Sequence, residues 1–109
     1  FTTSSADVGA ARRVDALLNR LFIEPALGLG YPTDALPFLG DIMKKVAKPG
    51  DAERLRFDFD VIGLQHYFRA VVENSFFMPY LWAKDVSPLR RNVATITEMG
   101  WEVFPESMY

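Results

Sequence analysis

Three acidic side chains near the C-terminus have the type and spacing needed for hydrolytic chemistry. Glu98, Glu102 and Glu106 recur every four residues, which would place three carboxyl groups on one face of a helix. Two carboxyl groups about 5 Å apart can act as a nucleophile and an acid/base catalyst. Pro105 interrupts such a helix, so we interpret the three acids as solvated loop side chains. A small self-contained hydrolase using Glu98 and Glu102 is the alternative.

The composition excludes several other chemistries. The 109 residues include no cysteine and one histidine, which rules out a thiolate nucleophile, a disulfide scaffold and an all-histidine metal cluster. The lone His66 is interpreted as a hydrogen-bonded structural residue. The net charge is -2 and no basic stripe is present, so no nucleic acid is expected as a partner. No apolar run approaches the length of a membrane span, so no membrane partner is expected.

Length and hydrophobicity point to one domain at most. Half of the residues are hydrophobic, which argues against disorder. Residues 1–5 lack the basic and apolar regions of a signal peptide. The absence of cysteine is compatible with the cytoplasm or the periplasm, and the localisation is left open.

A first helix is predicted near the N-terminus. Its apolar residues recur at three- and four-residue steps: Val8, Ala11, Val14, Leu18, Leu21 and Phe22. Ser4 or Ser5 can cap this helix. Pro25 should end it near Ile23 or Glu24, because the residue before a proline is disfavoured in the helical region.

Two shorter helices are expected downstream. The first should begin around Pro37, where proline is tolerated in a first turn. Its apolar residues are Leu36, Leu39, Ile42, Met43 and Val46. Pro49 and Gly50 should break it, and Asp51 can cap a further short helix that runs through Leu55.

Residues 57–68 are the best strand candidate. Both of their alternating sides are partly apolar, which is typical of a parallel strand covered on both faces. Gln65 and Tyr67 fall on one side near its C-terminal end, and His66 falls on the other. Residues 71–72 and 78–82 could form short strands of a long loop or hairpin.

The order of these elements predicts an α/β fold that is part of a barrel. A helix, short helices, one buried strand and a long aromatic loop do not close on themselves, since one strand cannot make a sheet. We therefore expect residues 1–109 to be a single segment of a larger barrel domain. The chain also begins without methionine, and we expect a processed or excised piece.

Three ordered sequence blocks support this view. Residues 13–25, followed by Gly30-Tyr31-Pro32, are similar to R-x-D-x-x-x-N-R-x-F-x-D-P followed by G-x-Y-P, with Glu24 in place of Asp. Residues 59–67 are similar to a segment containing D-F-I-G-L-N-Y-Y, with Val61 in place of Phe, Gln65 in place of Asn and His66 in place of the first Tyr. Residues 97–109 are similar to T-x-M-G-W-E-x-x-P-E-G-L-Y, with Ser107 in place of Gly. In this order the blocks resemble family 1 glycoside hydrolases, the β-glucosidase-type barrel enzymes.

The resemblance implies a (β/α)8 TIM barrel in which residues 57–68 are the sixth strand. It implies hydrolysis of terminal β-linked sugars with retention, a β-glycoside substrate, and no cofactor or metal. The family's acid/base motif, T-x-N-E-P, is absent. Residues 96–100 nearly match its nucleophile motif, I/V-T-E-N-G, but the continuation matches a different segment. We therefore assign no catalytic residue, and Glu98 is not taken as the nucleophile.

The resemblance nominates three substrate-binding residues. The hydroxyl of the family's tyrosine at the position of Tyr67 bonds to the nucleophile carboxylate. The asparagine at the position of Gln65 lies beside the same carboxylate. The tryptophan at the position of Trp101 walls the leaving-group subsite. For each residue the alternative is local packing: an aromatic core filler, an interior amide, and a loop anchor.

Two expectations concern partners. A non-catalytic carbohydrate- or partner-binding module that reuses this segment is the alternative function, and exposed aromatic residues are its support. The open edges of a single strand should also make the chain associate with itself.

Overall fold

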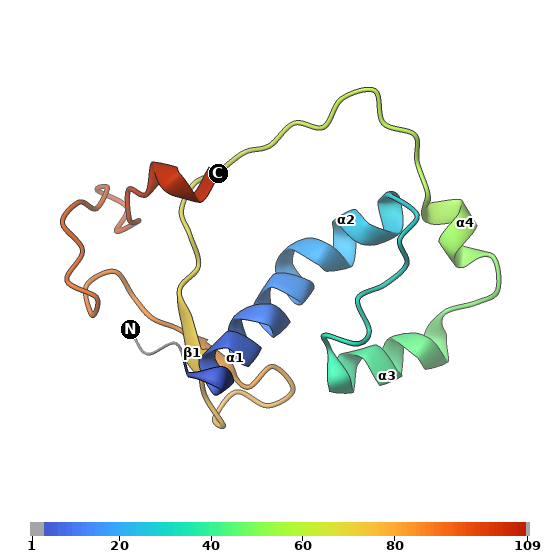
Figure 1. The fold of residues 1–109 in the computed structure, drawn as a ribbon, viewed down its shortest axis with the longest axis horizontal. Helices are drawn as coiled ribbons and strands as arrows, with labels where there is room; N and C mark the ends of the chain where they lie inside the picture. The colour runs from blue at the N-terminus through green and yellow to red at the C-terminus, as the bar shows by residue number, and fades with distance from the viewer. Residues whose placement is uncertain (1–3, 109) are drawn as a thin grey trace.

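The chain has a helical first half and a second half with little regular structure. The computed structural model describes residues 4–108. Helix α1 (Ser5–Asp15), a π-helical turn (Ala16–Arg20) and α2 (Leu21–Ala26) form one continuous rod. Helices α3 (Pro37–Val46) and α4 (Asp51–Leu55) follow, and then the two-stranded sheet of β1 (Val72–Asn74) and β2 (Ala83–Asp85). A 3-10 turn (Pro105–Met108) ends the described region (Figure 1).

The predicted start of the first helix is confirmed, but its predicted end is wrong. The Ser4 hydroxyl oxygen accepts a hydrogen bond from the Asp7 amide at 3.1 Å, so Ser4 is the cap. The rod continues through Pro25 to Ala26. Pro25 lies one residue from the end, where a missing N–H removes only one helical hydrogen bond. The bias before proline is too weak to end the helix earlier.

Helices α3 and α4 occupy the predicted residues. Pro37 is the first residue of α3. The predicted cap of α4 is wrong, because Gly50 takes that position with a φ of 87°. The Asp51 carboxylate instead accepts from the Lys48 amide at 2.8 Å. Gly40 of α3 packs on the preceding loop: a Cβ there would lie 2.3 Å from the Thr33 carbonyl oxygen.

The sheet is a small antiparallel hairpin. Val72 pairs with Asp85, and Asn74 pairs with Ala83. The prediction of a short strand at residues 71–72 overlaps β1, but the prediction at residues 78–82 is wrong. Those residues form the turn, since Tyr80 and Trp82 have φ values of 71° and 45°, outside the extended region.

The prediction of a strand over residues 57–68 is also wrong for this structure. Residues 56–70 follow an open, extended path above the helical rod (Figure 1). Within residues 4–108, no backbone hydrogen bond joins residues 58–70 to another part of the chain. A β-strand is defined by hydrogen bonds to a neighbouring strand, and no part of residues 4–108 pairs with this segment.

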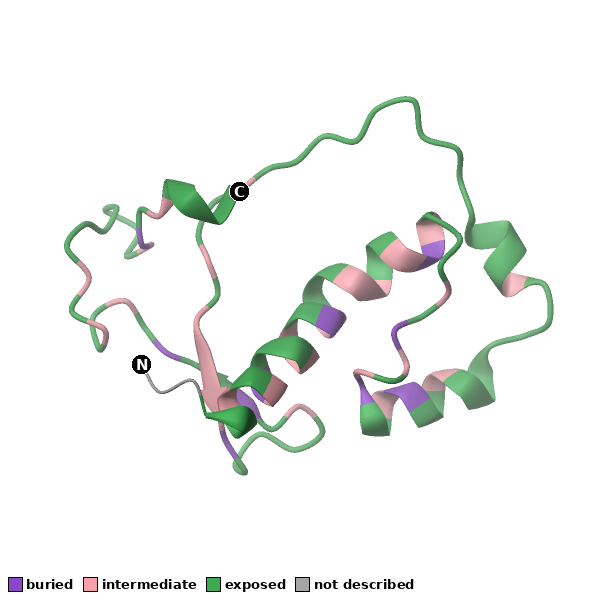
Figure 2. Cartoon of the chain, viewed as in Figure 1, coloured by how far each residue is buried: buried purple, intermediate pink, exposed green. Residues whose placement is uncertain are grey.

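Little of the chain is buried (Figure 2). Among residues 4–108 the buried hydrophobic side chains are Ala10, Ala16, Leu36, Ala83 and Val86. The predicted apolar face of the rod remains open, with Leu18 and Phe22 exposed by 60% and 68%. The radius of gyration is 16.3 Å, against about 13 Å for a compact domain of similar length. No helix within residues 4–108 has both the length and the apolar character needed to cross a membrane.

Candidate functional site

Two of the three predicted substrate-binding side chains are in contact. The rings of Tyr67 and Trp101 meet edge to face, with centroids 5.4 Å apart and an interplanar angle of 64°. Phe68 also packs against Trp101, at 5.3 Å. The extended segment supplies Tyr67 and Phe68, and the C-terminal loop supplies Trp101. Residues far apart in sequence therefore build one aromatic cluster, which we call the Tyr67–Trp101 cluster.

Gln65 stands apart from these rings. Its side chain is exposed, and within residues 4–108 it makes no hydrogen bond. It lines the same hollow as Tyr67, between the extended segment and the helical rod. The structure thus places Gln65 near Tyr67 on the segment but does not join it to Trp101.

A partly buried ion cluster lies beside the aromatic contact. The Arg69 guanidinium donates twice to the Glu102 carboxylate, at 2.9 Å and 2.8 Å. Arg91 donates to the same carboxylate at 2.7 Å and to the Val86 carbonyl oxygen at 3.1 Å. Glu102 is only 5% exposed, and the Arg91 side chain is only 3% exposed. We call these three residues the Arg69–Glu102–Arg91 cluster.

This cluster corrects the interpretation of Glu102 as a solvated loop acid. Glu98 and Glu106 are exposed, as predicted, but Glu102 is buried and paired. Sequence reasoning missed the pairing because Arg69 and Arg91 are remote in the chain. One signal was available in the sequence: the charged Glu102 has the hydrophobic residues Trp101, Val103 and Phe104 as its chain neighbours.

The cluster keeps Glu102 ionised. Hydrogen bonds from Arg69 first, and then from Arg91, lower the pKa of Glu102 from 4.5 to about 2, against the opposing effect of burial. Glu102 in turn raises the pKa of Arg69, mainly through the same hydrogen bond. A carboxyl group with this pKa holds no proton near neutral pH, so it cannot serve as a general acid. Its role here is to hold two segments together.

A second polar tie connects the same segments. The His66 Nε2 atom lies 2.6 Å from the Ser107 hydroxyl oxygen. That hydroxyl also donates to the Phe104 carbonyl oxygen at 2.7 Å, which leaves a lone pair to accept from Nε2. The expectation that His66 is hydrogen-bonded is confirmed. Ties on both sides of Tyr67, at His66 and Arg69, therefore fix it against Trp101.

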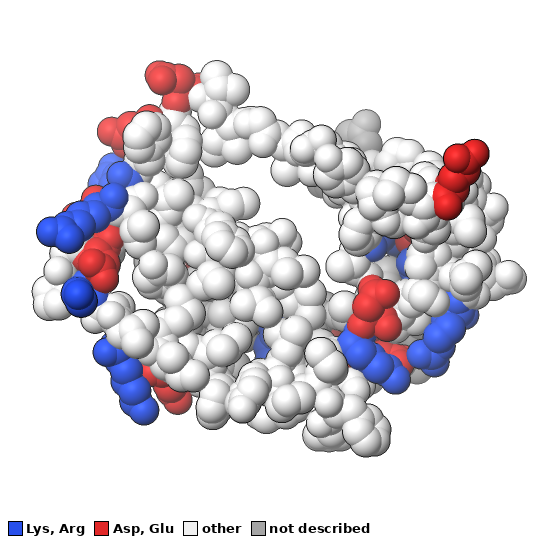
Figure 3. Space-filling model, turned by 180° about the vertical axis from the view of Figure 1, so that it is seen from behind, with Lys and Arg blue, Asp and Glu red and all other residues white. Residues whose placement is uncertain are grey.

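The aromatic cluster borders a large hollow. The space between the helical rod and residues 64–70 has a volume of about 660 Å³. Ala11, Val14, Leu18 and Ile23 line its helical side. Figure 3 shows uncharged side chains around the central opening and charged side chains toward the two ends of the molecule. Polar side chains also line the hollow, among them Asp15, Asn19 and Gln65, so its walls are both apolar and polar.

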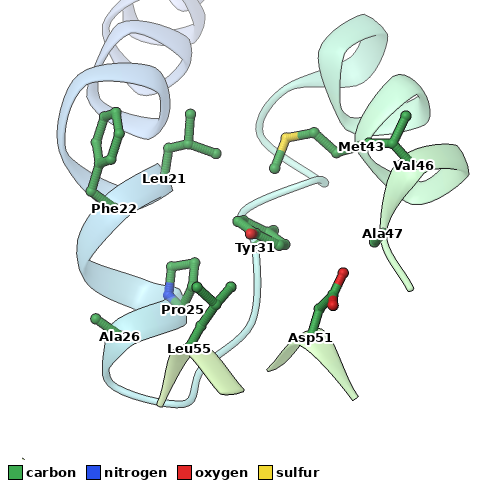
Figure 4. A pocket seen from close by; sticks show the side chains of 10 residues that line it. All are labelled: Leu21, Phe22, Pro25, Ala26, Tyr31, Met43, Val46, Ala47, Asp51 and Leu55. Atoms are coloured by element: carbon green, nitrogen blue, oxygen red, sulfur yellow. The ribbon is translucent and has the colours of Figure 1, made fainter. Parts of the chain in front are cut away.

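A separate hollow of about 480 Å³ lies among α2, α3 and α4 (Figure 4). Its lining is apolar apart from Tyr31 and Asp51, and the Asp51 carboxylate accepts from the Lys48 amide. Such a lining offers no nucleophile or acid/base pair. Within residues 4–108 no group of three or more histidine or acidic side chains could hold a metal ion.

Arg13 joins the first helix to the hairpin. It donates to the carbonyl oxygens of Leu81 at 2.7 Å and Trp82 at 3.1 Å, and its guanidinium lies 5.8 Å from the Trp82 ring centroid. Arg13 is half-buried at this joint. The exposed Phe76 and Phe77 occupy the hairpin turn.

Comparison with known proteins relates the chain to glycosidases. It is 29% identical over 116 residues to a bifunctional beta-D-glucosidase/beta-D-fucosidase of Bifidobacterium breve, covering 94% of this chain and 24% of that protein. It is 38% identical over 60 residues to thermostable beta-glucosidase B of Thermobispora bispora, covering 54% of this chain and 12% of that protein. No model of a protein family matches the chain.

A solved structure shows the same arrangement within a larger chain. The AHE enzyme from Alicyclobacillus herbarius superposes with a TM-score of 0.77 and 29% sequence identity, over 98% of this chain and 23% of that one. The chain thus spans about a quarter or less of each of these proteins. Its helices and small sheet agree with part of an α/β enzyme.

Proposed function

We propose that the chain forms one wall of the substrate site of a retaining β-glycosidase of the family 1 type. In this proposal residues 57–68 are the sixth strand of a (β/α)8 barrel, and the remaining strands belong to a longer polypeptide. The names of the two relatives and the order of the three sequence blocks support it. The exposed apolar faces of the rod and of the extended segment also support it, because a barrel would bury them.

The contact between Tyr67 and Trp101 carries the proposal. Trp101 would stack on the sugar in the leaving-group subsite, since the C–H faces of a sugar ring pack on indole. The Tyr67 hydroxyl would donate to the nucleophile carboxylate and keep it ionised. Gln65 would lie beside the same carboxylate. The nucleophile and the acid/base glutamate would come from other strands, because residues 1–109 lack both motifs.

The first test is activity of the chain by itself. Without the paired carboxylates it should not hydrolyse an aryl β-glucoside. Turnover that Glu98→Gln abolishes would contradict the proposal and favour a self-contained hydrolase. Sugar binding without hydrolysis, in a protein whose coding sequence adds neither T-x-N-E-P upstream nor I/V-T-E-N-G downstream, would favour the binding module.

The second test uses the longer polypeptide. Tyr67→Phe removes one charge-assisted hydrogen bond, so the activation barrier should rise by roughly 1.5–3 kcal/mol, or about 10- to 150-fold in rate. Ground-state binding should change less. Tyr80→Phe is the matched control, because Tyr80 stacks on Phe38 away from the cluster. Unchanged turnover and an unchanged pH–rate profile in Tyr67→Phe would show that Tyr67 only packs.

A further inference from the structure

The loop that carries Trp101 is shaped by local backbone contacts. Within residues 4–108, the backbone hydrogen bonds of residues 95–103 stay inside this stretch, which we call the Trp101 loop. The Thr97 amide donates to the Trp101 carbonyl oxygen at 2.8 Å, and the Trp101 amide donates to the Thr97 hydroxyl oxygen at 3.1 Å. These bonds give the loop its form, but they do not place it against another segment.

The Glu102 side chain supplies the polar attachment of this loop. Glu102 follows Trp101 directly in the chain. Its carboxylate accepts two hydrogen bonds from Arg69, which lies two residues after Tyr67. It accepts a third hydrogen bond from Arg91, in the turn that follows β2. One carboxylate therefore ties the Trp101 loop both to the extended segment and to the region after the hairpin.

This attachment fixes orientation as well as distance. Arg69 donates to both oxygens of the Glu102 carboxylate, and two parallel bonds of this kind have a defined geometry. The Arg69 guanidinium also lies 3.5 Å from the Phe104 ring centroid, within the range of a cation–π contact. Because Glu102 is nearly buried, water has little access to these bonds. A change at Glu102 therefore shifts the adjacent Trp101 ring relative to Tyr67.

We propose that Glu102 is a positioning residue that sets leaving-group specificity, because it holds Trp101 at its place beside Tyr67. This role rests on the proposed function, in which Trp101 packs on the leaving group and Tyr67 contacts the nucleophile. Glu102 acts through Trp101 and touches neither the sugar nor the reacting atoms. In that function Tyr67 lies on a barrel strand held by its neighbours, whereas the Trp101 loop depends on Glu102. Loss of the Glu102 contacts should therefore displace Trp101 more than Tyr67.

The size of the leaving group gives a direct test in the longer polypeptide. An aryl β-glucoside carries a ring that reaches Trp101, whereas the leaving group of β-glucosyl fluoride is a single atom. Glu102→Gln keeps the size of the side chain and removes its charge and part of its capacity to accept hydrogen bonds. The kcat/KM for the aryl glucoside should fall about 10- to 100-fold, since a displacement of about 1 Å can cost that much. The kcat/KM for the fluoride should be nearly unchanged.

The two steps of a retaining mechanism give a second readout. The leaving group has departed before water hydrolyses the glycosyl-enzyme, so Glu102→Gln should not slow this second step. With an aryl glucoside whose leaving group is good enough to make the second step rate-limiting, kcat should stay near the wild-type value while kcat/KM falls. A merely structural defect would instead reduce the amount of active enzyme and lower kcat in proportion.

Three further variants serve as controls, each checked for folding by circular dichroism at the assay temperature. Glu98→Gln changes an exposed acid of the same loop and should leave kcat/KM for both substrates unchanged. Tyr67→Phe acts at the nucleophile and should lower kcat/KM for both. Arg69→Gln breaks the cluster at a side chain that is 35% exposed and should repeat the selective loss. Loss of the fold in both Glu102→Gln and Arg69→Gln would leave the cluster a structural role only and would overturn the proposal.

The outcomes separate the role of Glu102 from the proposed function. If the wild-type enzyme cleaves both substrates and Glu102→Gln lowers kcat/KM equally for both, or for neither, the positioning role is wrong and the glycosidase function stands. If the longer polypeptide cleaves neither substrate, the proposed function is wrong and the role of Glu102 falls with it.

Discussion

The region around Glu102 and the extended segment over residues 57–64 differ in what holds them. Near Glu102, charged hydrogen bonds from Arg69 and Arg91 join segments that are remote in sequence. Along residues 58–64 no backbone hydrogen bond joins the segment to the rest of residues 4–108, and its apolar side chains are exposed. Both regions belong to the same proposed substrate wall.

The difference separates what the chain supplies from what it requires. The polar contacts around Trp101 are complete within the chain, so the Tyr67–Trp101 cluster can form without a partner. Apolar faces gain stability only when something removes them from water, and within residues 4–108 much of the apolar face of the rod stays exposed.

Arg91→Met should have the largest effect. It removes a nearly buried guanidinium and its hydrogen bonds to Glu102 and Val86, so the free energy of unfolding should fall by about 3 kcal/mol. Urea titration followed by Trp101 fluorescence, in a Trp82→Phe background, measures this loss. Arg90→Met is the control, because Arg90 is 64% exposed and pairs only at the surface with Glu73. Equal decreases in the free energy of unfolding in the two variants would show that the Arg69–Glu102–Arg91 cluster contributes no more stability than an exposed ion pair.

Acid should release the same region. The pKa of Glu102 falls from 4.5 to about 2 on folding, so its contribution to stability is complete above pH 4.5. The contribution is lost as the pH drops from about 4.5 to about 2. The Trp101 signal should therefore change in this window, and Glu102→Gln should abolish the change. Glu73 also has a lowered pKa, mainly through Lys84, so Glu73→Gln, which leaves the cluster intact, is the control that should retain the change.

Arg13→Met should have an intermediate effect at the joint between α1 and the hairpin. The variant loses the hydrogen bonds to Leu81 and Trp82, and the free energy of unfolding should fall by about 2 kcal/mol. Arg12→Met, at the exposed neighbouring position, should change it little. Hydrogen exchange of the β1–β2 amides would locate the loss. Unchanged exchange in Arg13→Met would show that the hairpin is held without it.

The smallest effect is expected at the helix cap. Ser4→Ala removes the acceptor for the Asp7 amide, so α1 should lose about 1 kcal/mol of stability. Ser5→Ala lies inside the helix and should have no such cost. Helical circular dichroism during thermal unfolding compares the two variants. Equal transition temperatures would exclude a role for the Ser4 cap.

The elements specified by local chemistry could be predicted from the sequence. The cap at Ser4, the start of α3 at Pro37 and the extent of α4 depend on neighbouring residues alone, and the structure agrees with them. The predicted end of the first helix was wrong, because the weak bias against helical backbone before Pro25 was treated as decisive. The prediction of a short strand over residues 78–82 was wrong because nothing in the sequence signals the positive φ of Tyr80 and Trp82.

Features that depend on distant residues could not be predicted in the same way. The apolar residues on both sides of residues 57–68 indicate a strand, but a strand needs a pairing neighbour, and residues 4–108 place none beside it. From the sequence alone Glu102 is expected to be a surface acid. Only the structure shows that Arg69 and Arg91 surround it. The resemblance to a known family brought Tyr67 and Trp101 to attention together. Their contact still had to be found in space.

The π-helical turn over Ala16–Arg20 has a consequence for the direction of the rod's side chains. The Leu21 amide bonds to the Ala16 carbonyl oxygen, five residues back, so the turn holds one more residue than an α-helical turn. Each residue of an α-helix turns the direction of the side chains by about 100°. The extra residue therefore acts as a phase shift between α1, which faces the hairpin, and α2, which faces α4. A single continuous rod can in this way contact two neighbours on different sides.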